Sequence, residues 1–137
     1  MSHEIRLLYA SDAQAGLSYR DVLTIMEKAA RANTTRGITG LLCYGFGQFL
    51  QVLEGERAMV NELYHHIVRD PRHAACQLLL VEDIAERDFP EWSMKVVNWS
   101  DAAASAQSAS FAPSMMTGIE ALDFLRRVAA AERELLE

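Results

Sequence analysis

Two apolar segments joined by a short glycine-containing turn limit the folds that are open to this chain. Residues 38–44 are apolar and β-competent, the tripeptide Gly45-Phe46-Gly47 supplies a turn, and residues 48–54 continue as a second β-competent segment. Strands joined by so short a turn have to pair in antiparallel orientation. We therefore predict a β-hairpin over residues 38–54, and the other elements have to be arranged around it.

A helix is predicted on each side of this hairpin. Ser18 and Asp21 have the spacing of a capping box, which marks a helix start, and the polar stretch before Gly37 marks its end. The second helix follows Gly55 and ends at Asp70, because Pro71 cannot continue it. Residues at three- and four-residue spacing give each helix one apolar face. They are Val22, Ile25, Met26 and Ala29 in the first helix and Met59, Leu63 and Ile67 in the second.

Three further segments have strand character. Residues 5–10 alternate weakly, residues 76–81 form the nearly continuous apolar run typical of a strand covered on both faces, and residues 92–98 follow a Phe89-Pro90 turn. Because each helix follows a strand and crosses back over the sheet, right-handed crossovers place both helices on one face. The predicted fold is α+β: a ferredoxin-like sandwich with an about five-stranded mixed sheet and two helices on one face.

The end of the chain is predicted to be a separate helical extension. Residues 100–114 are rich in alanine, serine and glutamine without apolar periodicity, as in a linker. Thr117 and Glu120 then have capping-box spacing, and a helix with one apolar stripe runs towards Glu137. The stripe consists of Ile119, Leu122, Leu125 and Val128. We expect a folded unit over residues 1–99, an extension over residues 100–137, and self-association through the stripe.

Composition argues against several classes of partner. Lysine and arginine number 13 against 19 acidic residues, a net charge of -6, so no basic face for nucleic acid is expected. No segment approaches the roughly 18 apolar residues that a membrane span needs, and we expect a cytoplasmic protein.

Motifs for enzymes and metal sites are also missing. Cys43 and Cys76 have no CxxC partner, and the adjacent His65 and His66 point about 100 degrees apart on a helix. No HExxH or GxSxG motif occurs. We predict neither a metal site nor an enzyme.

Polar residues within the apolar patterns indicate where a site could lie, because a buried polar group without a partner costs roughly 1 to 3 kcal/mol. Gln51 shares a strand face with Phe49 and Leu53, while Tyr9 shares one with Leu7. The carboxamide and the phenol could therefore satisfy each other. Two interpretations stay open: a structural hydrogen bond of the core, or part of a binding site.

Other polar and apolar candidates are equally ambiguous at this level. Asn33 could be a helix C-terminal cap, and Trp92 and Met94, on one face of a predicted strand, could be core residues. The charged cluster after the second helix is either a solvated terminus or a phosphate-binding group. It consists of Arg69, Asp70, Arg72 and His73.

Taken together, these residues resemble the BLUF family of flavin-binding blue-light sensors. The most specific segments are residues 33–44, which read NTTRGITGLLCY, and residues 49–55, which read FLQVLEG. The flanking segments LLYAS, RDPRH and FPEWSM begin at residues 7, 69 and 89. The resemblance covers roughly residues 5–97, in matching order and spacing.

The resemblance implies a role for each matching residue. Tyr9 and Gln51 would be the photoactive pair, accompanied by Trp92, Ser93 and Met94, and Asn33 would hydrogen-bond the flavin ring. The residues expected to pack against the isoalloxazine are Ile25, Leu41, Phe49 and Ile67. His66 is expected near the phosphates of the cofactor, and Arg69, Asp70 and His73 are also expected to contact the cofactor.

The resemblance also implies a mechanism and partners. Light would make the flavin a strong oxidant, Tyr9 would give it an electron and a proton, and recombination would leave Gln51 in a different hydrogen-bonding state with a small red shift. FAD is the expected cofactor, and FMN or riboflavin could substitute. A separate effector protein and a homo-oligomer are the expected partners. The competing interpretations are a ferredoxin-like regulatory module for a colourless metabolite and a small acyl or phosphate hydrolase.

Overall fold

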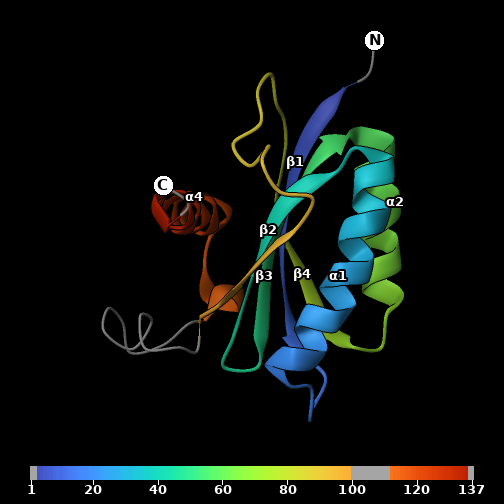
Figure 1. Cartoon of the computed structure of the whole chain (residues 1–137), viewed down its shortest axis with the longest axis vertical. Helices are drawn as coiled ribbons and strands as arrows, with labels where there is room; N and C mark the ends of the chain where they lie inside the picture. Colours follow the sequence, from blue (N-terminus) through green and yellow to red (C-terminus); the bar gives the residue numbers. More distant parts are fainter. Residues whose placement is uncertain (1–2, 100–111, 136–137) are drawn as a thin grey trace.

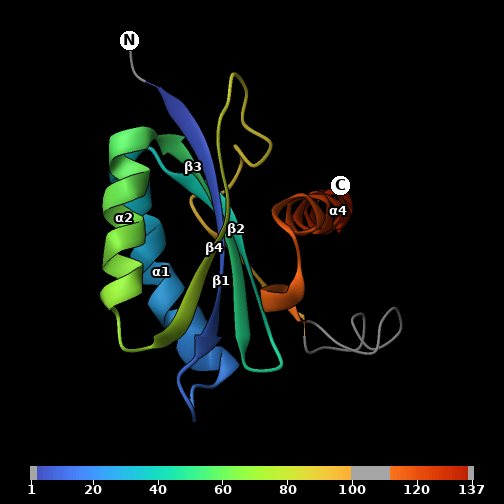
Figure 2. The same cartoon turned by 180° about the vertical axis from the view of Figure 1, so that it is seen from behind.

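A computed structural model describes residues 3–99 and 112–135 and shows a mixed sheet with helices on both faces (Figures 1 and 2). The five strands lie in the order β4-β1-β3-β2-β5, antiparallel except for the parallel pair β2 and β5. The elements are β1 (Glu4–Ala13), α1 (Tyr19–Arg36), β2 (Thr39–Gly45), β3 (Gln48–Glu56), α2 (Arg57–Arg69), β4 (His73–Asp83), β5 (Lys95–Asn98), a short 3-10 helix (Pro113–Met115) and α4 (Gly118–Leu135). This arrangement confirms the predicted α+β, ferredoxin-like fold with a C-terminal helix.

The central hairpin forms as predicted. Its two turn residues, Phe46 and Gly47, have φ angles of 49° and 74°, the left-handed backbone that two-residue turns between twisted strands require. The turn fixes the register, which pairs Leu42 with Gln51. Gln51 and Leu42 therefore point to the same face of the sheet.

Helices α1 and α2 both cover that face (Figure 1). Ser18 and Asp21 form the predicted capping box, and α1 ends at Gly37, whose φ of 70° suits a left-handed C-cap. Helix α2 ends before Asp70, as Pro71 requires. The two helices lie side by side, and their apolar faces pack on the sheet.

Helix α4 covers the opposite face (Figure 2). Thr117 and Glu120 form the predicted capping box. The buried stripe consists of Ala121, Leu122, Leu125, Val128 and Ala129. Ile119 was predicted in this stripe, but it is 78% exposed because the first turn of α4 directs it outward. The stripe is buried within the chain itself, so it does not offer the apolar face on which self-association was predicted.

A cluster of charged side chains around the buried Arg6 and Glu54 connects β1, β3 and β4. Glu54 is fully buried and accepts from Arg6 Nε at 2.8 Å and from the backbone N–H groups of Asp88 and Phe89 at 3.0 and 2.8 Å. Arg6 also contacts Glu82 at 2.6 Å and Asp88 at 3.1 Å. Glu54 thus anchors the loop after β4 to the sheet.

Two strand predictions need correction. The apolar run of β4 was expected to be covered on both faces, but β4 is an edge strand, and Leu78 is 52% exposed. The last strand begins at Lys95 rather than at Trp92. The carbonyl of Trp92 accepts from Gly40 N–H, and that of Ser93 accepts from the Asn33 side chain, so this segment leaves the regular ladder. The expected linker lies mostly outside the described residues.

Candidate functional site

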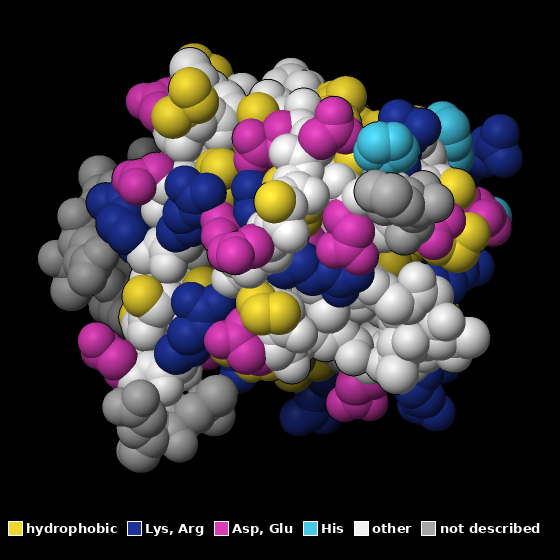
Figure 3. Space-filling view, turned by 90° about the horizontal axis from the view of Figure 1, so that it is seen from above, with side chains coloured by type: hydrophobic (Ala, Val, Ile, Leu, Met, Phe, Trp, Pro, Cys, Tyr) yellow, Lys and Arg dark blue, Asp and Glu magenta, His cyan; other side chains and the backbone are white. Residues whose placement is uncertain are grey.

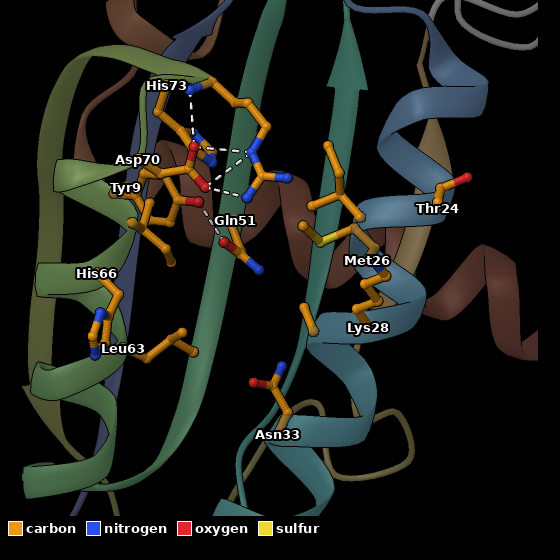
Figure 4. A pocket seen from close by; sticks show the side chains of 14 residues that line it. Tyr9, Thr24, Met26, Lys28, Asn33, Gln51, Leu63, His66, Asp70 and His73 are labelled. Atoms are coloured by element: carbon orange, nitrogen blue, oxygen red, sulfur yellow. Dashed lines mark hydrogen bonds and ion pairs between the residues drawn. The ribbon is translucent and has the colours of Figure 1, made fainter.

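A cavity of about 350 Å³ lies between α1 and α2, above β1 and β3 (Figure 4). This volume is in the range of small-molecule pockets, roughly 300 to 1,000 Å³. The lining residues come from both helices, both strands and the α2–β4 connection: Tyr9, Thr24, Ile25, Met26, Lys28, Ala29, Asn33, Gln51, Leu63, His66, Ile67, Asp70, Arg72 and His73. The cavity therefore lies between the two crossover helices and the sheet.

The floor of the cavity contains a hydrogen-bonded pair from neighbouring strands. The register of β1 and β3 places Tyr9 opposite Gln51, and the hydroxyl of Tyr9 donates to Gln51 Oε1. Tyr9 is fully buried, and this burial raises the pKa of its phenol well above the ordinary value. Tyr9 therefore stays protonated and acts as the donor.

The other end of the Gln51 carboxamide also has a partner. Its Nε2 donates to the sulfur of Met94 at 3.2 Å. The amide is thus oriented with its oxygen toward Tyr9 and its nitrogen toward Met94. Because an amide carries an acceptor and a donor at opposite corners, turning it over would exchange both contacts. The Gln51 side chain thus joins Tyr9 to the segment before β5.

Asn33 brings an unsatisfied acceptor to the end of the cavity that lies away from Asp70 and His73 (Figure 4). Its Nδ2 donates to the carbonyl of Ser93 at 3.0 Å, while its Oδ1 is buried and has no hydrogen-bond partner among the described residues. The neighbouring Thr34 exchanges a hydrogen bond with the Ser93 hydroxyl at 2.7 Å. Asn33 is not the helix cap, since Gly37 has that role. Its carbonyl oxygen is available to a ligand donor.

Charged groups gather at the α2–β4 end of the cavity. The carboxylate of Asp70 forms a bidentate ion pair with Arg72, and this contact lowers the pKa of Asp70. His73 contacts Ser11 Oγ through Nδ1 at 2.8 Å, and its burial lowers its pKa. Lys28 lines the cavity from α1, on the other side from Asp70 and His73 (Figure 4). The α2–β4 end is therefore polar, and the charge of Arg72 is already paired with Asp70.

Eight of the residues expected to contact a cofactor line the cavity: Tyr9, Ile25, Asn33, Gln51, His66, Ile67, Asp70 and His73. Phe49 is on the same face but does not line the cavity; it packs with Val22 and Leu42, and its ring lies 4.8 Å from that of His73. Arg69 is exposed and does not line the cavity, and Arg72 lines it instead.

Two expected positions are wrong. Leu41 was expected to pack between the helices, but it belongs to the core cluster under α4, because Leu42 is the neighbour that shares a face with Gln51. Trp92 and Met94 were expected on one strand face. Trp92 packs on the α4 cluster instead, whereas Met94 packs with the clusters under α1 and α2.

Some lining residues were not expected at the site. They are Thr24, Met26, Lys28, Ala29, Leu63 and Arg72. A signal existed for α1, since Lys28 follows Thr24 by four residues and Ile25 by three, the spacings that share a helix face. Arg72 belonged to the charged cluster noted in the sequence, but spacing alone does not distinguish it from Arg69.

The surface seen from above carries interspersed acidic and basic side chains, with hydrophobic groups in small separate patches (Figure 3). That face has no extended patch of one charge. Within residues 3–99 and 112–135, no helix is long and apolar enough to cross a membrane, and no group of three or more His, Cys, Asp or Glu side chains could hold a metal ion.

The fold and the cavity define a ligand-binding module rather than a scaffold without a pocket. Residues 5–95 match the family BLUF, described as sensors of blue-light using FAD. The chain belongs to the BLUF family, and it is therefore a flavin-based blue-light sensor module. This assignment decides against the metabolite module and the hydrolase.

Curated relatives carry the similarity within much longer chains. The photoactivated adenylate cyclase subunit beta of Euglena gracilis is 38% identical over 89 residues, covering 64% of this chain and 10% of that protein. The blue light- and temperature-regulated antirepressor BluF of Escherichia coli (strain K12) is 29% identical over 90 residues, 66% of this chain and 22% of that protein. The chain thus spans about a tenth of the length of the cyclase subunits it matches.

Similar solved structures extend over nearly the whole chain. The BLUF protein BlrB in its dark state has a TM-score of 0.79 at 32% identity, covering 96% of this chain and 98% of that chain. BlsA in a photo-activated state has a TM-score of 0.79 at 30% identity, covering 90% of this chain and 93% of that chain. The similarity therefore includes more than the matched residues 5–95.

Proposed function

We propose that the cavity between α1 and α2 binds the flavin, and that Tyr9 and Gln51 convert its excitation into a changed hydrogen-bond network. The observation that carries this proposal is the continuous series Tyr9 hydroxyl, Gln51 carboxamide and Met94 sulfur at the cavity floor. The series connects the phenol of Tyr9, which can be oxidised, with a segment outside the pocket. A hydrogen bond with a purely structural role would not require this connection.

The lining suits a flat heteroaromatic ring with hydrogen-bonding groups at one edge. Ile25 on α1 and Ile67 on α2 line the cavity and offer apolar surface from the two helices. The unpartnered Oδ1 of Asn33 would accept from a ring N–H, and the Gln51 amide would donate to a ring carbonyl. An isoalloxazine ring has both groups at one edge, so the residues present fit a flavin.

The side chains around the cavity determine the response to excitation. A bound flavin supplies absorption of blue light and, once excited, a strong oxidant for a neighbouring phenol. The protonated hydroxyl of Tyr9 donates to Gln51 Oε1. When Tyr9 loses and regains this proton, Gln51 is free to change its hydrogen-bond partners. One or two such hydrogen bonds are worth roughly 0.5 to 1.5 kcal/mol each, enough to shift a two-state equilibrium by about tenfold.

The cofactor is proposed to be FAD, with FMN or riboflavin as substitutes. Arg72 is paired with Asp70, which leaves little free charge for a phosphate at that end of the cavity. The ring, rather than the tail, should therefore dominate recognition. Mass analysis of the flavin released by denaturation identifies the bound form.

Replacing Gln51 by leucine is expected to keep the flavin and abolish the light-induced red shift. Leucine has a similar size but can neither accept from Tyr9 nor donate to Met94 or to the ring. Difference absorption spectra before and after blue light measure the shift. Gln77→Leu is the matched control, because Gln77 is exposed on the edge strand β4 and should retain a normal shift. A normal shift in Gln51→Leu would contradict the proposed network.

Replacing Asn33 by leucine should weaken flavin binding by about 3- to 10-fold, the equivalent of one neutral hydrogen bond. The change removes the acceptor Oδ1 and keeps the volume. Titration of flavin-free protein with FAD, followed by flavin fluorescence, measures the affinity. Asn61→Leu, at an exposed position of α2 outside the cavity, is expected to bind FAD as wild type does. Unchanged affinity in Asn33→Leu would remove Asn33 from the binding site.

The output is proposed to pass from Gln51 to Met94 and along the Trp92–Met94 segment to α4. From α4 it is proposed to reach a separate effector protein. Relatives of this module include a photoactivated adenylate cyclase subunit and a light-regulated antirepressor, which supports a regulatory output. A homo-oligomer also stays a proposal. Deleting everything beyond Ser100 is a poor test of this route, because α4 covers Leu8, Leu50 and other core residues.

A further inference from the structure

The segment between β4 and β5 crosses from one face of the sheet to the other within three residues. Trp92 packs on the cluster that includes Leu125 and Val128 of α4. Met94 packs under α1 and α2 and accepts from Gln51 Nε2. The backbone at Ser93 therefore connects a side chain packed under α4 with one packed under α1 and α2.

One side chain of α4 contacts this segment at three points. Arg133 forms a bidentate ion pair with the carboxylate of Glu91. It also donates to the backbone carbonyl of Asp88 at 2.6 Å. Its guanidinium carbon lies 5.5 Å from the centre of the Trp92 ring, within cation–π distance.

These contacts differ from an ordinary surface ion pair. A flexible pair between exposed side chains contributes little, because ordering both chains offsets the attraction. The planar guanidinium of Arg133 instead contacts a carboxylate, a carbonyl and an aromatic face at once, and these contacts fix the orientation of the side chain. Arg127, on the same helix, has only an i,i+4 pair with Asp123 and is 72% exposed at its side chain.

Two further ion pairs join the same elements. Arg126 of α4 contacts the Asp88 carboxylate at 2.6 Å, and Asp88 also contacts the buried Arg6. Glu132 of α4 contacts Lys95, the first residue of β5, at 3.4 Å. Helix α4 is therefore connected to both ends of the 88–95 segment, with Arg133 at its middle.

We propose that Arg133 is a positioning residue, which holds Trp92 on the α4 side of the sheet and makes α4 respond to changes at Gln51. This inference rests on the proposed function of Gln51, and it adds the side chain through which α4 is joined to the network. Arg133 touches neither the cavity nor Tyr9, so it sets the position of the Trp92–Met94 segment and not the photochemistry.

The dark state provides a test that needs no light response. Protein labelled with fluorotryptophan gives two fluorine NMR signals, from Trp92 and Trp99, which Trp92→Phe assigns. In Arg133→Gln the Trp92 signal is expected to shift and broaden. The Trp99 signal, from a ring 4.8 Å from that of Phe124, should stay in place. Arg127→Gln is the matched control and should leave both signals unchanged.

Coupling to light is tested by amide hydrogen exchange in α4, measured in the dark and under blue light with FAD bound. Wild type and Arg127→Gln are expected to show a light-dependent change in α4. Arg133→Gln is expected to lose that change while keeping its red shift. The proposal would be overturned by an unshifted Trp92 signal in Arg133→Gln. It would also be overturned if hydrogen exchange in α4 changed equally with light in wild type and Arg133→Gln, or did not change in wild type. Absence of the red shift in wild type would instead refute the proposed function.

Discussion

Tyr9→Phe is expected to abolish the light-induced red shift of the bound flavin completely. Only one oxygen atom is lost, and phenylalanine fits the same buried space, with the ring of Tyr64 5.5 Å away. Without the hydroxyl, no proton lies on the bond to Gln51, and Gln51 has no reason to change partners. Difference absorption spectra of the FAD-loaded protein, before and after blue light, measure the effect.

Tyr64→Phe is the control for this experiment. Tyr64 lies beside Tyr9 but does not line the cavity, so its variant should bind flavin and shift normally. The Tyr9 variant should also bind flavin, because a phenol is not needed to fill the floor. A normal red shift in Tyr9→Phe would show that another group gives up the electron and proton.

Glu54→Gln is expected to lower the free energy of unfolding by about 3 kcal/mol. Removing one partner of a buried ion pair costs about 3 to 5 kcal/mol, and the lower value applies because Arg6 keeps Glu82 and Asp88. The substitution also weakens the hydrogen bonds that the Glu54 side chain accepts from the backbone N–H groups of Asp88 and Phe89. Urea unfolding at one fixed FAD concentration measures the loss.

Glu56→Gln, two residues further along β3, is the matched control. Glu56 is exposed and makes no side-chain hydrogen bond to the start of α2, so its variant should stay within about 0.5 kcal/mol of wild type. A loss below about 1 kcal/mol in Glu54→Gln would mean that the cluster around Arg6 is replaceable. The anchoring of the loop after β4 would then need another explanation.

The amino-acid sequence by itself determined the features that depend on near neighbours in the chain. Ser18 and Thr117 begin helices because each has an acidic residue three positions later, and Pro71 ends a helix because proline lacks the N–H that the next turn needs. The hairpin turn follows from Gly47. The pairing of Tyr9 with Gln51 was predictable because two inward-pointing polar groups needed partners.

The tertiary structure decided which face or edge each segment occupies. Residues 40–43 are all buried, so their apolar pattern could not show that Leu41 faces α4 and Leu42 faces α1. The exposure of Leu78 depends on β4 lying at an edge, which strand order sets and composition does not. Trp92 and Met94 separate because Gly40 and Asn33 take the carbonyls of Trp92 and Ser93.

The same distinction holds at the functional site. Sequence patterns singled out Tyr9, Gln51 and Asn33, which line the cavity, since burying polar groups without partners is costly. They did not single out Lys28 or Arg133 and did not separate Arg72 from Arg69, because the surroundings of a charged side chain depend on segments far away in the chain. Helix caps and turns depend on residues within about four positions of one another in the chain. Which face or edge of the sheet a segment occupies is fixed only when segments far apart in the chain pack together.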